Sequence, residues 1–236
     1  MRIIGLKLVL ILSLITEFGN SLNIGEILKY DAYFSNINAA EGSLKVFGIE
    51  KIDNVETYHV RFNAKTKGIT NRIFPINDVV DLWLDKETLL PQRIKSNIRE
   101  GQFRKNEDIY FYQKDGYAIK NKEKINIEGD VHSPFSLFYY FRNQELDSYK
   151  PQKINILKGN KLEAIQIRIE KNIKVSVPAG DYNCTKIIPT NIKGQKFKNN
   201  AEMEIYFSND SNYYPIKIKI KLKFGSLTLK LKEIIS

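Results

Sequence analysis

The sequence predicts a mainly β protein, in which antiparallel strands form curved sheets of a half-barrel or sandwich with one short helix near residues 133–143. Most of the chain after residue 22 alternates apolar and polar side chains, which is the period of a strand with one buried face. Glycine-containing turn signals separate several of these runs, and a single segment has helical spacing instead. The 236 residues are 42% hydrophobic, which is enough to build the core of one domain over residues 22–236.

The first 21 residues have the pattern of a cleavable secretory signal peptide. A basic start precedes the apolar run Leu8–Ile15, and small residues at Gly19 and Ser21 favour cleavage before Leu22. The apolar run is too short to cross a bilayer, and the alternatives are a buried first helix or an uncleaved anchor. The sequence therefore predicts export to the periplasm. Lipid attachment is not expected, because no cysteine lies near the cleavage site.

The clearest strand pair lies near the C-terminus. Residues Ile216–Phe224 alternate apolar side chains with lysines, and Leu227–Lys232 continue the alternation after Gly225 and Ser226. This predicts a hairpin with a two-residue turn, apolar on one face and cationic on the other. Shorter runs of the same kind predict strands at Tyr30–Phe34, Leu44–Ile49, Tyr58–Ala64, Val79–Leu84, Arg93–Arg99, Ile109–Tyr112 and Ala164–Ile169.

One segment, SPFSLFYYFRNQEL from Ser133 to Leu146, predicts a short amphipathic helix over Pro134–Asn143. It begins with a serine in the N-cap position and a proline in the first helical position. Its aromatic side chains recur at i, i+3 and i+4, so they share one face. Such a face usually packs in a core, and the alternative is that it contacts a ligand. We expect this helix to cover one opening of the curved sheet.

A shift of 124 residues aligns the chain with itself without a gap. Tyr58 then falls on Tyr182 and Pro91 on Pro215, and the order of strands and turns is the same in both copies. This predicts two pseudo-repeated meanders, over residues 40–125 and 164–236. The alternative is chance similarity between stretches of biased composition.

The only cysteine, Cys184 in VPAGDYNC, is predicted to be a small apolar residue within a strand, because the same shift aligns it with Val60. A single cysteine cannot form an internal disulfide. The chain has two histidines, far apart in sequence, and no G-x-S-x-G, H-E-x-x-H, C-x-x-C, P-loop or dinucleotide motif. We therefore expect no metal and no cofactor. Carboxylates remain available for chemistry, but Asp81 and Asp85 lie opposite the apolar face of their strand.

The formal net charge is +10, and it falls to +9 when the signal peptide is removed. A basic exported protein meets anionic lipid or acidic polymer rather than nucleic acid. In the predicted hairpin, Lys221 faces Lys230 and Lys219 faces Lys232, which is unfavourable unless the amines are solvated or bridged by an anion. The candidate contacts with an anionic surface are Lys217, Lys219, Lys221, Lys223, Lys230 and Lys232. The alternative is a solvated face that prevents edge-to-edge aggregation.

Four segments carry a resemblance to a known family: GEILKYDAYF at residues 25–34, HSPFSLFYYFR at 132–142, VPAGDYNC at 177–184 and YYPIKI at 213–218. In their order along residues 25–235, they resemble an exported bacterial family labelled only as domain of unknown function 3108. The resemblance implies a periplasmic, mostly β protein and supplies no catalytic residue. DLWLDKETLLPQRI at residues 81–94 is also similar to a strand–turn–strand unit of lipoprotein-carrier-like folds, in which a curved sheet encloses an apolar cavity.

These observations favour a non-catalytic periplasmic protein that binds a hydrophobic or lipidic ligand or serves an envelope assembly. The candidate ligand contacts are Trp83, Phe138 and Tyr139, and Trp83 is set apart because it shares a strand face with two aspartates. The alternative is a carboxylate-dependent hydrolase of cell-wall or glycan material, which needs two acids in one cleft.

Overall fold

A computed structural model describes residues 22–146, 148–150, 152–191, 202–221 and 226–236, so the predicted signal peptide and Lys223 lie outside the described residues. All its strands belong to one sheet. They are β1 (Ile27–Phe34), β2 (Ile37–Ile52), β3 (Val55–Thr66), β4 (Asn77–Asp85), β5 (Pro91–Glu100), β6 (Phe103–Tyr112), β7 (Tyr117–Lys120), β8 (Glu123–Asn126), β9 (Val131–His132), β10 (Ile154–Lys158), β11 (Lys161–Val177), β12 (Gly180–Asn191), β13 (Glu202–Ser208), β14 (Pro215–Lys221) and β15 (Ser226–Ile235). The short helices are α1 (Gly68–Ile73), η1 (Gln113–Asp115) and α2 (Leu137–Arg142).

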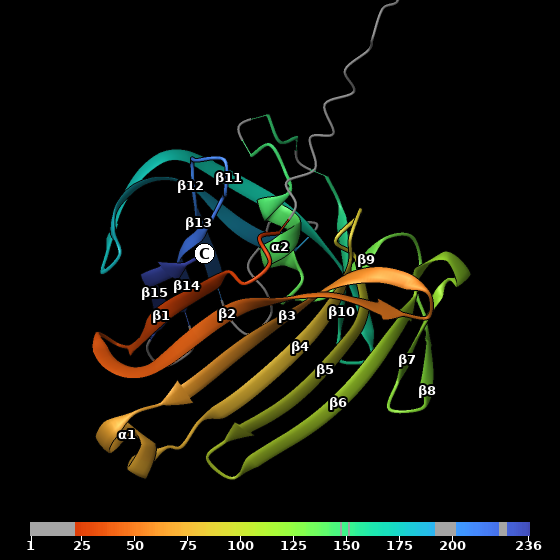
Figure 1. Cartoon of the computed structure of the whole chain (residues 1–236), viewed down its shortest axis with the longest axis horizontal. Helices are drawn as coiled ribbons and strands as arrows, with labels where there is room; N and C mark the ends of the chain where they lie inside the picture. Colours follow the sequence, from red (N-terminus) through yellow and green to blue (C-terminus); the bar gives the residue numbers. More distant parts are fainter. Residues whose placement is uncertain (1–21, 147, 151, 192–201, 222–225) are drawn as a thin grey trace, which may run out of the picture.

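The strand order is β8-β7-β6-β5-β4-β3-β2-β1-β15-β14-β13-β12-β11-β10-β9. Every neighbouring pair is antiparallel except β9 with β10. The sheet curls so that the strands of the N-terminal half and those of the C-terminal half lie on two sides of α2 (Figure 1). The predicted mainly β curved sheet is thus confirmed, as a single sheet that the parallel β9–β10 pair makes mixed.

The two edge strands, β8 and β9, follow each other in sequence but are not paired, so the sheet is not closed. Side chains join these edges instead. The Gln113 amide donates to the carbonyl of Val131 at 2.9 Å and accepts from its N–H at 3.2 Å. Asn160 accepts from Lys120 and donates to Glu123. The Gln113 bonds satisfy the backbone carbonyl and N–H of Val131 in the edge strand β9, whereas the Asn160 bonds join side chains only.

The alternation seen in the sequence decides which side chains fill the interior. Val80, Leu82 and Leu84 of β4 belong to the buried core, together with apolar residues from the facing strands. Cys184 is fully buried in the same core, as predicted, and burial raises the pKa of its thiol to about 11. At neutral pH this thiol is therefore protonated and a poor nucleophile.

The helix α2 is shorter than predicted, and it lies between the strands of the two halves of the curved sheet (Figure 1). Residues before Leu137 form a turn, which is fixed because Ser133 and Ser136 exchange hydrogen bonds between hydroxyl and backbone N–H groups at 2.8 and 3.0 Å. Most of α2 is buried, including Phe138 and Tyr139. The second helix, α1, was not predicted, because its six residues are too few for a periodic pattern.

A buried ion pair holds α2 against the start of the chain. The Arg142 guanidinium donates to both carboxylate oxygens of Glu26, at 2.6 and 2.9 Å, and also to the carbonyl of Asn212. Burial alone would lower the pKa of Arg142, but the Glu26 carboxylate outweighs it and raises that pKa. Glu26 and Arg142 belong to two of the segments that carry the family resemblance, so those segments meet at this pair.

The register of the C-terminal hairpin differs from the prediction. Lys217 lies opposite Lys230, and Lys219 lies opposite Thr228, so the expected pairs of Lys221 with Lys230 and Lys219 with Lys232 are wrong. The cause is a longer connection, because β14 ends at Lys221 and β15 begins at Ser226. The slip is an even number of residues, so the lysines stay on the predicted face.

The elements follow the 124-residue shift seen in the sequence. It moves β2 from residues 37–52 to 161–176, where β11 spans Lys161–Val177, and it moves β5 from 91 to the first residue of β14, Pro215. The strands β1–β6 and β10–β15 occur in the same order on either side of the β1–β15 pair.

In the described part of the chain, no helix combines the length and apolarity that a bilayer crossing requires.

Candidate functional site

A groove of about 640 Å³ runs across the outer face of the sheet, where β15, β1, β2 and β3 lie side by side. Its cationic lining consists of Lys29, Lys45, Lys65 and Lys232, and its acidic lining of Asp31, Glu41 and Glu233. Ser43, Asn63 and Asn77 add neutral hydrogen-bonding groups. We call it the cationic groove. Its position follows from the pairing of β1 with β15, which brings together the two ends of the described chain.

Two of the acids in the cationic groove are already neutralised by neighbouring lysines. Lys29 contacts Glu233 at 2.9 Å, and Asp31 is 3.0 Å from the ammonium of Lys67 and 3.9 Å from that of Lys232. Burial would raise the pKa of Asp31, but hydrogen bonds from Lys67 and Asn38 outweigh it and hold that pKa below its usual value.

Two lysines of the groove, Lys45 and Lys65, have no carboxylate within ion-pair distance among the described residues. The Lys45 ammonium lies over the ring of Phe47, 4.4 Å from its centroid, and the Lys65 side chain is exposed. Among the described acids that line the groove, only Glu41 has no ion-pair partner; it is exposed and lies opposite Lys65. The groove therefore presents positive charge that the chain itself does not fully compensate.

The lysine face predicted from sequence adjoins this groove, because β15 pairs with β1 on one side and with β14 on the other. The Lys217 ammonium lies 4.9 Å from the centre of the Tyr206 ring, and the Lys230 ammonium lies 4.6 Å from that of Tyr33. Burial of the Lys217 ammonium lowers its pKa, and the positive charges of Lys219 and Lys230 lower it further. Lys219 lies opposite Glu204. The described lysines of this face are Lys217, Lys219, Lys221, Lys230 and Lys232.

Next to the groove, a row of stacked side chains crosses five strands. Phe47, His59 and Trp83 stack with ring centroids 4.9 and 4.7 Å apart, and Arg93 lies over both Trp83 and Tyr110. We call this row the outer ladder. Because the rings stack face to face, they cover one another, and Trp83 is buried although it lies on the outer face.

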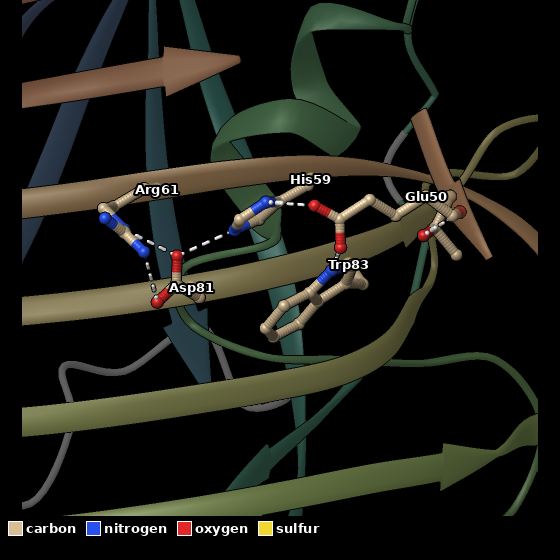
Figure 2. A network of polar contacts seen from close by, with 6 residues as sticks. Glu50, His59, Arg61, Asp81 and Trp83 are labelled. Carbon is tan, nitrogen blue, oxygen red and sulfur yellow. Dashed lines mark hydrogen bonds and ion pairs between the residues drawn. The ribbon is translucent and has the colours of Figure 1, made fainter. Parts of the chain in front are cut away.

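Carboxylates tie the outer ladder together (Figure 2). His59 bonds Glu50 through Nδ1 and Asp81 through Nε2, both at 2.8 Å, and Asp81 also accepts two hydrogen bonds from Arg61. Both partners of His59 are acceptors, so both bonds are donated only when the ring is doubly protonated. The indole N–H of Trp83 donates to Glu50 at 2.7 Å, and this bond, followed by the charge of His59, lowers the pKa of Glu50.

The outer ladder positions one side of the cationic groove. Phe47 ends the row, and both Lys45, which lines the groove, and Arg61 lie over its ring. The alternation along β4 predicts its polar face but not this network. The missing information is the pairing of β2, β3 and β4, which brings Glu50, His59 and Asp81 together.

The three ligand contacts predicted from sequence do not lie together. Phe138 and Tyr139 are in the core on the inner side of the sheet, whereas Trp83 is in the outer ladder. The Tyr139 hydroxyl is buried with no hydrogen-bond partner, and burial raises its pKa. Within the described ranges, no group of three or more His, Cys, Asp or Glu side chains is arranged to hold a metal ion.

Among the solved structures that this chain resembles, one shares its general architecture. A β-barrel-like protein of domain of unknown function 1849 from Brucella abortus superposes with a TM-score of 0.58 at 11% identity, over 91% of this chain and 98% of that one. A candidate lipoprotein from Parabacteroides distasonis gives 0.41 at 13% identity, over 92% and 98%. A candidate exported protein with a YmcC-like fold from Bacteroides fragilis gives 0.39 at 12%, over 93% and 99%. No curated protein matches this chain.

The fold and the surface features define the class as an open, β-barrel-like protein with a helix packed inside and a cationic groove outside. Within this class, the chain belongs to the family DUF3108, described as "Protein of unknown function", whose model matches residues 29–232. The resemblance predicted from the four sequence segments is thus confirmed.

Proposed function

We propose that the protein is a non-catalytic, exported protein of the cell envelope that binds the phosphate-bearing headgroup of an anionic lipid in the cationic groove. The observation that supports this most is the groove itself, in which Lys45 and Lys65 have no carboxylate within ion-pair distance among the described residues, although Glu41 lies opposite Lys65 on the neighbouring strand. Ser43, Asn63 and Asn77 add the neutral groups that phosphate and glycerol oxygens need. The adjoining lysine face extends the attraction to an anionic surface.

Removing the two free lysines of the groove should weaken headgroup binding. In the double variant Lys45→Gln/Lys65→Gln, we expect the dissociation constant for monomeric dihexanoyl phosphatidylglycerol to rise roughly 30-fold. Each lysine near an anionic group contributes about 1 kcal/mol, and 1.4 kcal/mol is a factor of ten. NMR titration measures this constant, which should also rise with added salt.

Three comparisons make the test specific. The double variant Lys114→Gln/Lys122→Gln removes the same charge from exposed positions away from the groove and should bind as the wild type does. Dihexanoyl phosphatidylcholine should bind more weakly than phosphatidylglycerol. Glycerol 1-phosphate distinguishes a lipid ligand from a free phosphate ligand. If the ligand is a lipid, dihexanoyl phosphatidylglycerol should bind more tightly than glycerol 1-phosphate, because its acyl chains add contacts. Equal loss in both double variants would contradict the proposal.

A second candidate is a carboxylate-dependent hydrolase of glycan material. The observation that favours it is that Asp31 and Glu41 lie opposite each other on β1 and β2 within the groove. A general acid needs a raised pKa, whereas the pKa of Asp31 is lowered by its partners, so this carboxylate suits an anchoring role better. Release of reducing ends from peptidoglycan by the wild type, lost in Glu41→Gln, would establish this candidate instead.

A further inference from the structure

A second surface of the protein lies at the end of the sheet where β1 turns into β2. In an antiparallel meander alternate turns share one end, so the β1–β2 turn, the α1 connection and the β5–β6 turn lie together (Figure 1). Backbone hydrogen bonds join them: Lys67 donates to Ala39 at 3.1 Å, and Gly101 donates to Pro75 at 2.7 Å. Gly101 has φ +55°, and a Cβ there would lie 2.7 Å from the Phe74 ring.

Large apolar side chains are exposed at this end. Ile69 and Ile73 of α1 are 74% and 77% exposed, and Phe103 at the start of β6 is 55% exposed. We call this surface the apolar rim, and its members are Phe34, Ile37, Ile69, Ile73, Phe74 and Phe103. No residue of α1 is buried, so the helix adds no side chain to the buried core.

Basic side chains accompany the apolar rim. Arg72 lies between its two isoleucines in sequence, and the Arg104 guanidinium donates to the carbonyls of Gly101 and Phe103, which holds it beside the turn. Among the nearby acids, Asp78 is buried and accepts the N–H of Arg99. Burial of Glu100, followed by the charge of Asp78, raises the pKa of Glu100.

We propose that the apolar rim inserts into an anionic phospholipid bilayer, with Arg72 and Arg104 at the level of the headgroups. Exposed apolar side chains gain by leaving water, and flanking cations add attraction to anionic lipid. This charge complementarity favours a membrane over a neutral protein surface as the occupant. The inference goes beyond headgroup binding in the groove, because it uses different residues and can hold or fail without it.

This proposal is tested by measuring how the protein partitions into phospholipid vesicles. The vesicles contain phosphatidylcholine with 30 mol% phosphatidylglycerol, which gives roughly physiological charge. We expect Ile69→Ser/Ile73→Ser to lower the partition coefficient of the full chain roughly 10- to 100-fold. The matched control is Ile24→Ser, which removes an isoleucine that is 59% exposed at the opposite end of β1 and should leave the coefficient unchanged. Pure phosphatidylcholine vesicles should bind the wild type less.

A site-specific label distinguishes insertion from surface attraction. Because Cys184 is the only cysteine, an environment-sensitive fluorophore can be placed at Ile73→Cys or Ile24→Cys in a Cys184→Ala background. The label at 73 should shift to the blue with anionic vesicles and the label at 24 should not. The blue shift of the label at position 73 should persist in the Lys45→Gln/Lys65→Gln variant. Failure of headgroup binding in the cationic groove can therefore be told apart from failure of insertion by the apolar rim.

Three outcomes would overturn the inference. The first is unchanged partition of the rim variant, and the second is an equal loss in Ile24→Ser. The third is a rim variant that alters the mass of the protein in solution without altering partition, which would make the rim a contact between two copies.

Discussion

Replacing Arg142 by Met is expected to lower the free energy of unfolding by about 3–5 kcal/mol, because it leaves the Glu26 carboxylate buried without its partner. Glu26 is 1% exposed and receives two hydrogen bonds from the guanidinium. An uncompensated charge at such a position costs far more than the pair itself contributes. Urea unfolding at neutral pH, followed by tryptophan fluorescence, measures the change.

The control for this prediction removes both partners. Glu26→Leu/Arg142→Met leaves no buried charge, so most of the loss should be recovered, since apolar replacement of a buried pair is often neutral or stabilising. The two single changes and the double change form a cycle that isolates the coupling. A loss below 1 kcal/mol in Arg142→Met would show that the pair is not desolvated in solution.

Acidification is expected to destabilise the protein through His132. This ring is buried, its Nδ1 has no hydrogen-bond partner, and burial lowers its pKa to about 4. The unfolded chain takes up the proton near pH 6.5, while the folded state resists until about pH 4. The stabilising contribution is therefore complete above pH 6.5 and falls by about 3 kcal/mol as the pH drops to 4.

The variant His132→Phe keeps an aromatic ring against Tyr140, whose centroid lies 4.6 Å from that of His132, and it removes the titration. Its free energy of unfolding should depend less on pH than that of the wild type between pH 6.5 and 4, while both proteins share the titration of their carboxylates. The control is His59→Gln, which leaves the buried ring in place and should retain the His132 contribution. Parallel curves for wild type and His132→Phe would contradict the assignment.

Much of the fold could be predicted because the alternation that marks a strand is visible within a few neighbouring residues. The alternation of Ile216 and Ile218 with Lys217 and Lys219 fixes which face is buried, whatever the strand pairs with. The same logic placed Trp83 opposite the apolar face of β4, whereas Cys184 was placed in the core because the 124-residue shift aligns it with Val60. The register of β14 with β15 was wrong because the length of a connection is not visible in periodicity.

The candidate site was predictable only in part. The lysine face was found from one hairpin, whereas the cationic groove needs β1 to pair with β15, a contact between distant parts of the chain. The outer ladder depends on the pairing of β2, β3 and β4, and no local signal links Glu50 with Asp81. The apolar rim was missed because exposed isoleucines in a six-residue helix look like any short apolar stretch.

The sequence by itself determined the strand character, the inward and outward faces and the membership of the DUF3108 family, because each is carried by short segments of neighbouring residues. Only the tertiary structure decided which strands adjoin, and so where charges and exposed apolar groups gather. The physical reason is that the backbone hydrogen bonds between two strands are the same whatever side chains the strands bear, so these bonds do not specify which strands pair. The choice of partners is therefore made by packing of the whole sheet around α2 and the Glu26–Arg142 pair.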